Sequence, residues 1–172
     1  NDQFACMLCG VGFDGKVAHD FANQPKRGLA TYIKQTLSNF FSAKTYRFEL
    51  KMKTATLKTD AYFISIANSN QFGNNFTIAP KANLSDGLLD IVIVTNQNKL
   101  SFVLQTIKQV AGRNKLQTEN FINEKKSVIY FQTDELVIKN LSAAPMHIDG
   151  DPAETPLQIK IKVAPSCFHL IQ

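Results

Sequence analysis

Acidic side chains in three segments have the types and spacing that could support chemistry. Near the end of the chain, residues 147–154 (HIDGDPAE) place Asp149, Asp151 and Glu154 within about one turn. Like charges this close together raise one another's pKa values, which suits a general base. Taken alone, the segment is more simply explained as an acidic surface turn, and His147 could be a packed or surface residue as easily as a proton relay.

The second acidic segment is the stretch 68–94, where turn residues separate two apolar runs. Gly73 and Gly87 allow positive φ, Pro80 fixes φ, and Asp86 can accept a hydrogen bond from its own turn. A short carboxylate beside a glycine, with main-chain carbonyls turned inward, is the kind of loop that binds a hard cation. A polar connection without a ligand is the simpler explanation of the same residues.

The third segment, residues 10–15 (GVGFDG), fits the G-x-G-x-x-G pattern of dinucleotide-binding folds. That fingerprint also needs a helix beginning at the glycines and an acidic residue about twenty positions later. No acidic residue occurs from Lys34 to Phe48. We therefore interpret the glycines as a tight strand exit that exposes Asp14, which taken alone is a turn or helix-capping residue.

The cysteines predict neither a disulfide framework nor a metal site. An odd number of cysteines, in a chain whose start has no pattern of a signal peptide, favours a reducing compartment. Cys6 and Cys9 form a C-x-x-C pair, but no second Cys or His pair has the spacing that zinc usually needs. We expect both side chains to be buried as small hydrophobic residues of one strand.

The composition predicts a single domain over residues 1–172. Hydrophobic residues make up 44% of the chain, enough for a substantial core, and no segment resembles a membrane span. The 19 basic and 14 acidic residues give a net charge of +5, which favours approach to anionic surfaces such as phospholipid headgroups. The basic residues are scattered, so we predict no nucleic-acid partner.

The polarity pattern predicts strands along most of the chain and two helical segments. Strand patterns occur at 46–50, 61–68, 88–94, 127–131, 135–141, 146–150 and 157–163, with turns expected at 58–60 and at Asp149–Gly150. Helical spacing occurs at 16–41, interrupted near 23–25, and at 102–112. Short strands with few helices indicate a mainly β (α+β) fold, an antiparallel β-sandwich with two helical excursions.

Three motifs together resemble the diacylglycerol kinase and sphingosine kinase family of lipid kinases. Residues 79–94 (APKANLSDGLLDIVIV) are similar to its A-P-x-A-x-x-x-D-G-x-L-D signature. GVGFDGKVA resembles its G-x-G-F-D-A segment, and HIDGDPAE resembles its D-G-E segment. The resemblance extends over essentially the whole chain, but covers only the C-terminal domain of a two-domain catalytic unit. The nucleotide-binding domain, with its Gly-Gly-Asp-Gly-Thr phosphate loop, is expected to be absent from these residues.

The resemblance implies transfer of the ATP γ-phosphoryl group to a lipid hydroxyl, and it implies roles for particular residues. Asp151 would be the general base, Asp149 a supporting carboxylate, and Asp14 would help to orient substrate or a metal-water network near the interdomain cleft. The family has Glu where this chain has Asp151, whose oxygens therefore fall back by about 1.5 Å unless Glu154 reaches in. We expect negligible ATP turnover by these 172 residues alone.

The resemblance also implies a structural Mg²⁺ bound by the Asp86 carboxylate and the carbonyl oxygens of Asn83 and Leu88, while the catalytic Mg²⁺ arrives with ATP. It implies a lipid substrate, and a cytoplasmic position at the periphery of the membrane. It also implies docking with a nucleotide-binding domain, and it allows a homodimer. Two alternatives stay open: a non-catalytic lipid-binding module, and the C-terminal domain of a soluble-metabolite kinase such as NAD kinase. Which lipid is phosphorylated is not predicted.

Overall fold

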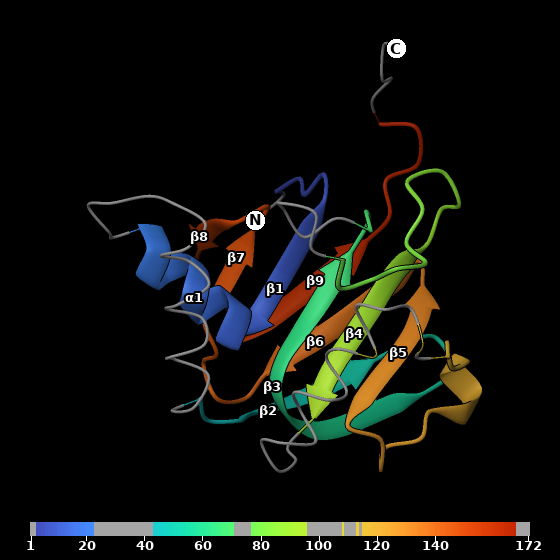
Figure 1. The fold of residues 1–172 in the computed structure, drawn as a ribbon, viewed down its shortest axis with the longest axis horizontal. Coiled ribbons are helices and arrows are strands. Elements are labelled where there is room, and N and C mark those ends of the chain that lie inside the picture. The colour runs from blue at the N-terminus through green and yellow to red at the C-terminus, as the bar shows by residue number, and fades with distance from the viewer. Residues whose placement is uncertain are drawn as a thin grey trace.

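The computed structural model describes residues 3–22, 43–70, 77–95, 108, 113 and 115–167 (Figure 1). The elements in chain order are β1 (Leu8–Gly12), α1 (Phe13–Ala22), β2 (Tyr46–Lys51), β3 (Thr56–Ala67), β4 (Leu89–Thr95), the 3₁₀ turn η1 (Glu119–Phe121), β5 (Val128–Thr133), β6 (Glu135–Asn140), β7 (Met146–Ile148), β8 (Asp151–Ala153) and β9 (Gln158–Lys162). All pairings between these named strands are antiparallel, as predicted.

The long strand β3 connects the two layers of the fold. Its residues 56–61 pair with β2, and its residues 63–67 pair with both β1 and β4. From β3, a front layer extends through β4 and β5 and through β1, β7 and β8, while a back layer extends through β2, β6 and β9. The register with β4 shifts between Ala61 and Phe63, an irregularity of the kind that bends a strand. The sheet therefore curls back on itself (Figure 1).

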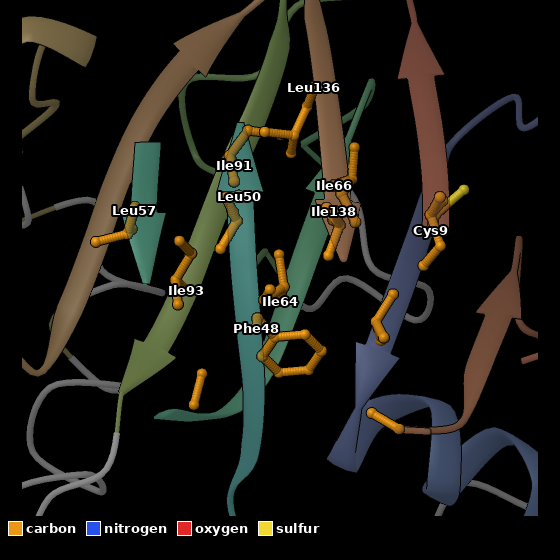
Figure 2. Close-up of a cluster of buried hydrophobic side chains, with 14 of the residues drawn as sticks. Cys9, Phe48, Leu50, Leu57, Ile64, Ile66, Ile91, Ile93, Leu136 and Ile138 are labelled. Carbon is orange, nitrogen blue, oxygen red and sulfur yellow. The ribbon is translucent and has the colours of Figure 1, made fainter. Parts of the chain in front are cut away.

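The main hydrophobic core lies between the two layers. Ile64 and Ile91 from the front layer and Leu50 and Ile138 from the back layer are fully buried in the same cluster (Figure 2). Burial of side chains of this size contributes roughly 1.5–3 kcal/mol each to the free energy of unfolding. The core thus joins segments of the chain that are far apart in sequence.

The predicted alternation in β2 is confirmed. Its residues alternate strictly between buried and more exposed positions, so one face of the strand packs on the core and the other faces solvent. In contrast, all seven residues of β4 are buried. The outer face of the front layer is covered by α1, through Phe13 and Val17, and by Ile78 and Ala79. A strand covered on both faces is expected to be apolar along its length, and β4 is so apart from Asp90 and Thr95.

Two predicted boundaries are wrong. The turn expected at 58–60 lies earlier, where the Met52 N–H donates to the Ala55 carbonyl at 2.9 Å, and β3 already includes Lys58 and Asp60. These polar residues are on the solvent side of the strand. The helix predicted from residue 16 begins at Phe13, because Gly12, with φ of 107°, turns the chain directly after β1.

The second predicted helix, at 102–112, lies outside the described residues apart from Lys108, and so does the whole of the segment 23–41. The dinucleotide interpretation of GVGFDG is excluded by topology. β1 pairs antiparallel with both β3 and β7, whereas the dinucleotide fingerprint belongs to a parallel βαβ unit. Within the described ranges, no helix is both long and apolar enough to cross a membrane.

The packing of the core predicts a large effect of Leu50→Ala. Leu50 is fully buried between the layers, so truncation leaves a cavity and should lower the free energy of unfolding by about 2–5 kcal/mol in urea denaturation. Leu141→Ala is the matched control, because Leu141 is exposed and its truncation should change the stability by less than about 0.5 kcal/mol. Equal effects of the two variants would contradict the assignment of the core.

Candidate functional site

Two of the three predicted acidic segments meet at one end of the front layer. β7 pairs with β1, with Gly10 opposite His147, and α1 follows β1 directly. Figure 1 shows α1 beside β7 and β8. The approach of α1 to β7 needs a residue without a side chain, since a Cβ added at Gly15 would lie 2.3 Å from the Pro145 carbonyl oxygen. His19 is packed here as well, with its Nε2 3.0 Å from the Met146 carbonyl oxygen.

Asp14 and His147 lie against each other above Gly10. The Nε2 atom of His147 is 3.5 Å from Oδ2 of Asp14, and both side chains are at least nine-tenths buried. The Asp14 Oδ1 atom accepts the N–H of Gly15 at 2.9 Å, as expected for an acidic residue in the first turn of a helix. The predicted strand exit is therefore present, but it buries Asp14 rather than exposing it to solvent.

Asp149 connects the β7–β8 turn to the segment before β1. Its Oδ2 accepts the N–H of Cys6 at 2.7 Å, and its Oδ1 accepts those of Met7 and Leu8 at 2.9 and 2.8 Å. Both Asp149 and Gly150 have positive φ, as in the two-residue turns that join hairpin strands, so the predicted tight turn is confirmed. The carboxylate that was expected to support catalysis thus holds two chain segments together.

Asp151 and Glu154 are exposed, at and just after β8. In the register of β7 with β8, Asp151 lies opposite Ile148, and His147 lies opposite Pro152. Since neighbouring residues of a strand point to opposite faces, Asp151 is on the other face of the sheet from His147 and Asp14. The structure therefore brings Asp14 and His147 together, and leaves the Asp151 carboxylate at the sheet edge.

The two cysteines of the C-x-x-C pair have different surroundings. Cys9 is buried in the main core, as predicted, and burial raises the pKa of its thiol to about 12, with smaller contributions from Asp149 and Asp14. This thiol stays protonated and unreactive at neutral pH. Cys6 is exposed, so the prediction of burial is wrong for it. Cys6 precedes β1, which begins only at Leu8, and it is therefore not part of a buried strand.

The loop with the predicted cation ligands is held by its own polar groups. The Asp86 N–H donates to the Asn83 carbonyl oxygen at 3.4 Å, and Asp86 Oδ1 accepts the Leu88 N–H at 2.9 Å. Asn83 Oδ1 accepts from Ser85. The described residues contain no group of three or more His, Cys, Asp and Glu placed to hold a metal ion. A cation in this loop would therefore need main-chain carbonyl oxygens, which are hard ligands suited to Mg²⁺.

Asp90 is fully buried beside this loop. The Tyr130 hydroxyl donates a hydrogen bond to Asp90 Oδ1 and accepts the N–H of Lys81 at 3.0 Å. Gln132 Nε2 donates to Asp90 Oδ2 at 2.9 Å. Burial is the main cause that raises the pKa of Asp90, and burial with the Asp90 contact raises that of Tyr130. This network fastens the loop to β4 and β5.

Sequence reasoning did not identify Gly10, Asp90 and Tyr130 as parts of these arrangements. For Asp90 a signal was present, because it is an acidic residue within an otherwise apolar run, and such runs are typically buried on both faces. Ser65 is a further buried polar residue of the same front layer, opposite Gly10 in β1. Its hydroxyl makes no hydrogen bond to another described residue.

Comparison with known proteins gives a consistent result. The model of the YegS C-terminal NAD kinase beta sandwich-like domain matches residues 8–172. A "Probable lipid kinase YegS-like" of Shewanella frigidimarina is 24% identical over the whole chain and 56% of its own length. A "Probable lipid kinase YegS" of Escherichia coli is 25% identical, over 95% of the chain and 54% of its own length. The chain thus spans about half the length of these curated relatives.

The same fold occurs in solved structures. A crystal structure described as a "putative diacylglycerol kinase" from Bacillus anthracis superposes with a TM-score of 0.66 at 15% identity, over 96% of this chain and 51% of the other. A second diacylglycerol kinase structure from the same organism gives a TM-score of 0.57 at 16% identity, over 92% of this chain and 46% of the other. At these identities the likeness concerns the fold, and it confirms the predicted antiparallel β-rich architecture.

The environment of Asp90 predicts a particular pH dependence of stability. Its pKa in the folded state lies above the ordinary value of 3.8, so the unfolded state releases this proton first as the pH rises. The stability contributed by protonated Asp90 is fully present below pH 3.8 and is lost as the pH rises through the folded-state pKa. The free energy of unfolding, measured in urea, should therefore fall relative to that of Asp90→Asn as the pH rises from about 3.8. If the free energy of unfolding of the wild type minus that of Asp90→Asn stays constant or increases with pH, this account of Asp90 is contradicted.

Proposed function

We propose that this chain, which belongs to the family of YegS C-terminal NAD kinase beta sandwich-like domains, is part of a lipid kinase that transfers the ATP γ-phosphoryl group to a lipid hydroxyl. The observation that supports this most strongly is the meeting of GVGFDG and HIDGDPAE across the β1–β7 pairing, where Asp14, His147 and the β7–β8 turn lie at one end of the sheet. These are the motifs that resemble the lipid kinases.

Phosphoryl transfer asks the protein for positioning, charge neutralisation and a carboxylate that accepts the proton of the attacking hydroxyl. We assign this carboxylate to Asp151, because it is exposed and makes no hydrogen bond or ion pair through its side chain within the described part of the chain. Asp149, in contrast, already accepts three main-chain N–H groups. Glu154 is the next candidate, since it is exposed and lies three residues further along.

ATP and its Mg²⁺ would be bound mainly by residues outside this chain, which covers about half of its curated relatives. Within the chain, the oxygen atoms of Asn83, Asp86 and Leu88 suit a second, structural Mg²⁺, which would supply positive charge that braces the loop. One oxygen of Asp86 accepts the Leu88 N–H, so the other is the one that would bind the ion.

A peripheral position at the membrane surface follows from the proposed lipid substrate, and the net charge of +5 favours anionic headgroups. The second candidate function, phosphorylation of a soluble metabolite, is favoured by one observation, the NAD kinase-like description of the matched family. An acceptor assay distinguishes the two, since a lipid product is extracted into organic solvent and a phosphorylated dinucleotide stays in water.

The proposed base predicts a loss of activity in Asp151→Asn. With the full-length protein, γ-labelled ATP and mixed micelles containing diacylglycerol or sphingosine, wild type should produce extractable label. The variant should lose about a hundredfold or more in rate, because the amide cannot accept the proton. Glu154→Gln and Asp149→Asn are assayed alongside, and the 172-residue chain alone is expected to give no label.

Loss of label in Asp151→Asn, with unchanged thermal unfolding, would support the assignment. Persistence of label would keep the kinase but move the base, with Glu154 as the next candidate. Label in NAD and none in any lipid would replace the proposed substrate class. No label in any acceptor would favour a lipid-binding module without chemistry.

The structural cation predicts that Mg²⁺ stabilises the fold through Asp86. For a dissociation constant of about 1 mM, a concentration of about 10 mM Mg²⁺ adds about 1.4 kcal/mol, which is visible as a higher Tm than in EDTA. Asp86→Ala should remove this difference, whereas Asp60→Ala, which removes an exposed carboxylate of β3, should retain it. A Tm that responds equally to Mg²⁺ in both variants would exclude the site.

A further inference from the structure

Three aspartates of the chain, Asp14, Asp86 and Asp149, are each followed by a glycine. In such a pair, the main-chain nitrogen of the glycine can attack the side-chain carboxyl carbon of the aspartate, because the glycine has no Cβ to hinder the approach. The three pairs are identical in sequence but have different surroundings in the fold. The structure therefore determines which of them can react.

The reaction of an Asp-Gly pair needs only water. A bond forms between the glycine nitrogen and the carboxyl carbon, and the proton of the nitrogen leaves with the hydroxyl of the protonated carboxyl group as water. Water then adds to one of the two carbonyl carbons of the cyclic imide and breaks its bond to nitrogen. Addition at the side-chain carbon restores aspartate, whereas addition at the main-chain carbon gives isoaspartate, so the net change is an isomerisation.

The pair of Asp14 and Gly15 is closed by helix α1. Asp14 lies in the first turn of the helix, and its side chain is only 9% exposed. The N–H of Gly15 is occupied, since it donates to Asp14 Oδ1 at 2.9 Å. A Cβ added at Gly15 would lie 2.3 Å from the Pro145 carbonyl oxygen, so the main chain has no room to rearrange. An imide here would require the first turn of α1 to open.

The pair of Asp149 and Gly150 is exposed, but its reacting groups are bound elsewhere. The Asp149 carboxylate accepts the N–H groups of residues 6–8. The N–H of Gly150 donates to Nδ1 of His147 at 3.2 Å. Attack of this nitrogen on the carboxyl carbon would break these hydrogen bonds and release the segment before β1. The fold therefore protects this pair without burying it.

The pair of Asp86 and Gly87 has none of these restraints. Both residues are exposed and lie outside helices and strands, and Figure 1 shows their loop, which precedes β4, projecting beyond the end of the sheet. The N–H of Gly87 makes no hydrogen bond within the described part of the chain, and a Cβ added there would meet no atom within 4 Å. The Leu88 N–H donates to Asp86 Oδ1 at 2.9 Å, which keeps the carboxyl group at the turn, next to the glycine.

We infer that Asp86 is a site of spontaneous covalent modification, which converts to isoaspartate while the fold protects Asp14 and Asp149. The product has one more methylene group in the main chain and one fewer in the side chain, so the carboxylate no longer reaches the Leu88 N–H. The cation site proposed above would thus lose its carboxylate ligand as the protein ages. This consequence rests on the proposed cation, whereas the modification itself does not.

Peptide mapping of the full-length protein tests the inference. After incubation of the folded protein in mildly acidic buffer, trypsin releases the three pairs in separate peptides, which end at Lys16, Lys99 and Lys160. Isoaspartate leaves the mass of a peptide unchanged but alters its chromatographic retention, and electron-transfer fragmentation locates it. We expect it to form at Asp86 at least about tenfold faster than at the other two positions, because a hydrogen bond to a charged group is worth about a factor of ten or more.

Two controls separate the effect of the fold from that of the sequence. In guanidinium chloride the three pairs are equally exposed, so isoaspartate should form at all of them at comparable rates. In folded Asp86→Glu, no isomer of the peptide that ends at Lys99 should form, because the longer side chain would have to close a larger ring. Equal rates at the three pairs in the folded protein would overturn the inference. So would an Asp86 that isomerises only after unfolding.

Discussion

The fold depends on one strand that takes part in two layers. β3 pairs with β2 over its first half and with β1 and β4 over its second half, so the back layer and the front layer are joined by a continuous backbone. The irregularity between Ala61 and Phe63 lets the strand bend, and the bend brings the two inner faces together around the main core. The site depends on the same strand indirectly, because β1, which pairs with β3 on one side, pairs with β7 on the other.

Most strands were predictable, because alternation and β-branched runs report burial on one face or on both. The alternation of β2 predicts a strand with one buried face. The largely apolar run of β4 predicts a strand that is buried on both faces, and both strands are present. The turn at 58–60 was not predictable from its polar residues, since Lys58 and Asp60 satisfy the solvent side of a strand as well as a turn. The early start of α1 depends on the conformation of Gly12, which nothing in the local residue pattern requires.

The acidic residues of the candidate site were proposed from their motifs, but their partners could not be predicted. The contacts of Asp149 with the amide groups of residues 6–8 and of Asp14 with His147 join segments from opposite ends of the chain, and local spacing contains no information on such contacts. The role of Asp90 was missed for the same reason, since the hydroxyl that binds it belongs to Tyr130 on another strand. Position 10 could be recognised as special, but the reason for its glycine required the three-dimensional arrangement.

The clamp between Asp149 and the start of β1 has a consequence for the order of folding. It joins residues separated by 143 positions, and closing such a loop costs more chain entropy than forming the β2–β3 hairpin, whose strands are joined by a few residues. Contacts of this separation form slowly, after local ones. During synthesis, β1 and α1 must therefore wait for β7 and the turn that follows it before the acidic groups acquire their partners. The region we assign to phosphoryl transfer can thus be completed only after most of the chain has been synthesised, because its parts come from residues 6–14 and 147–154.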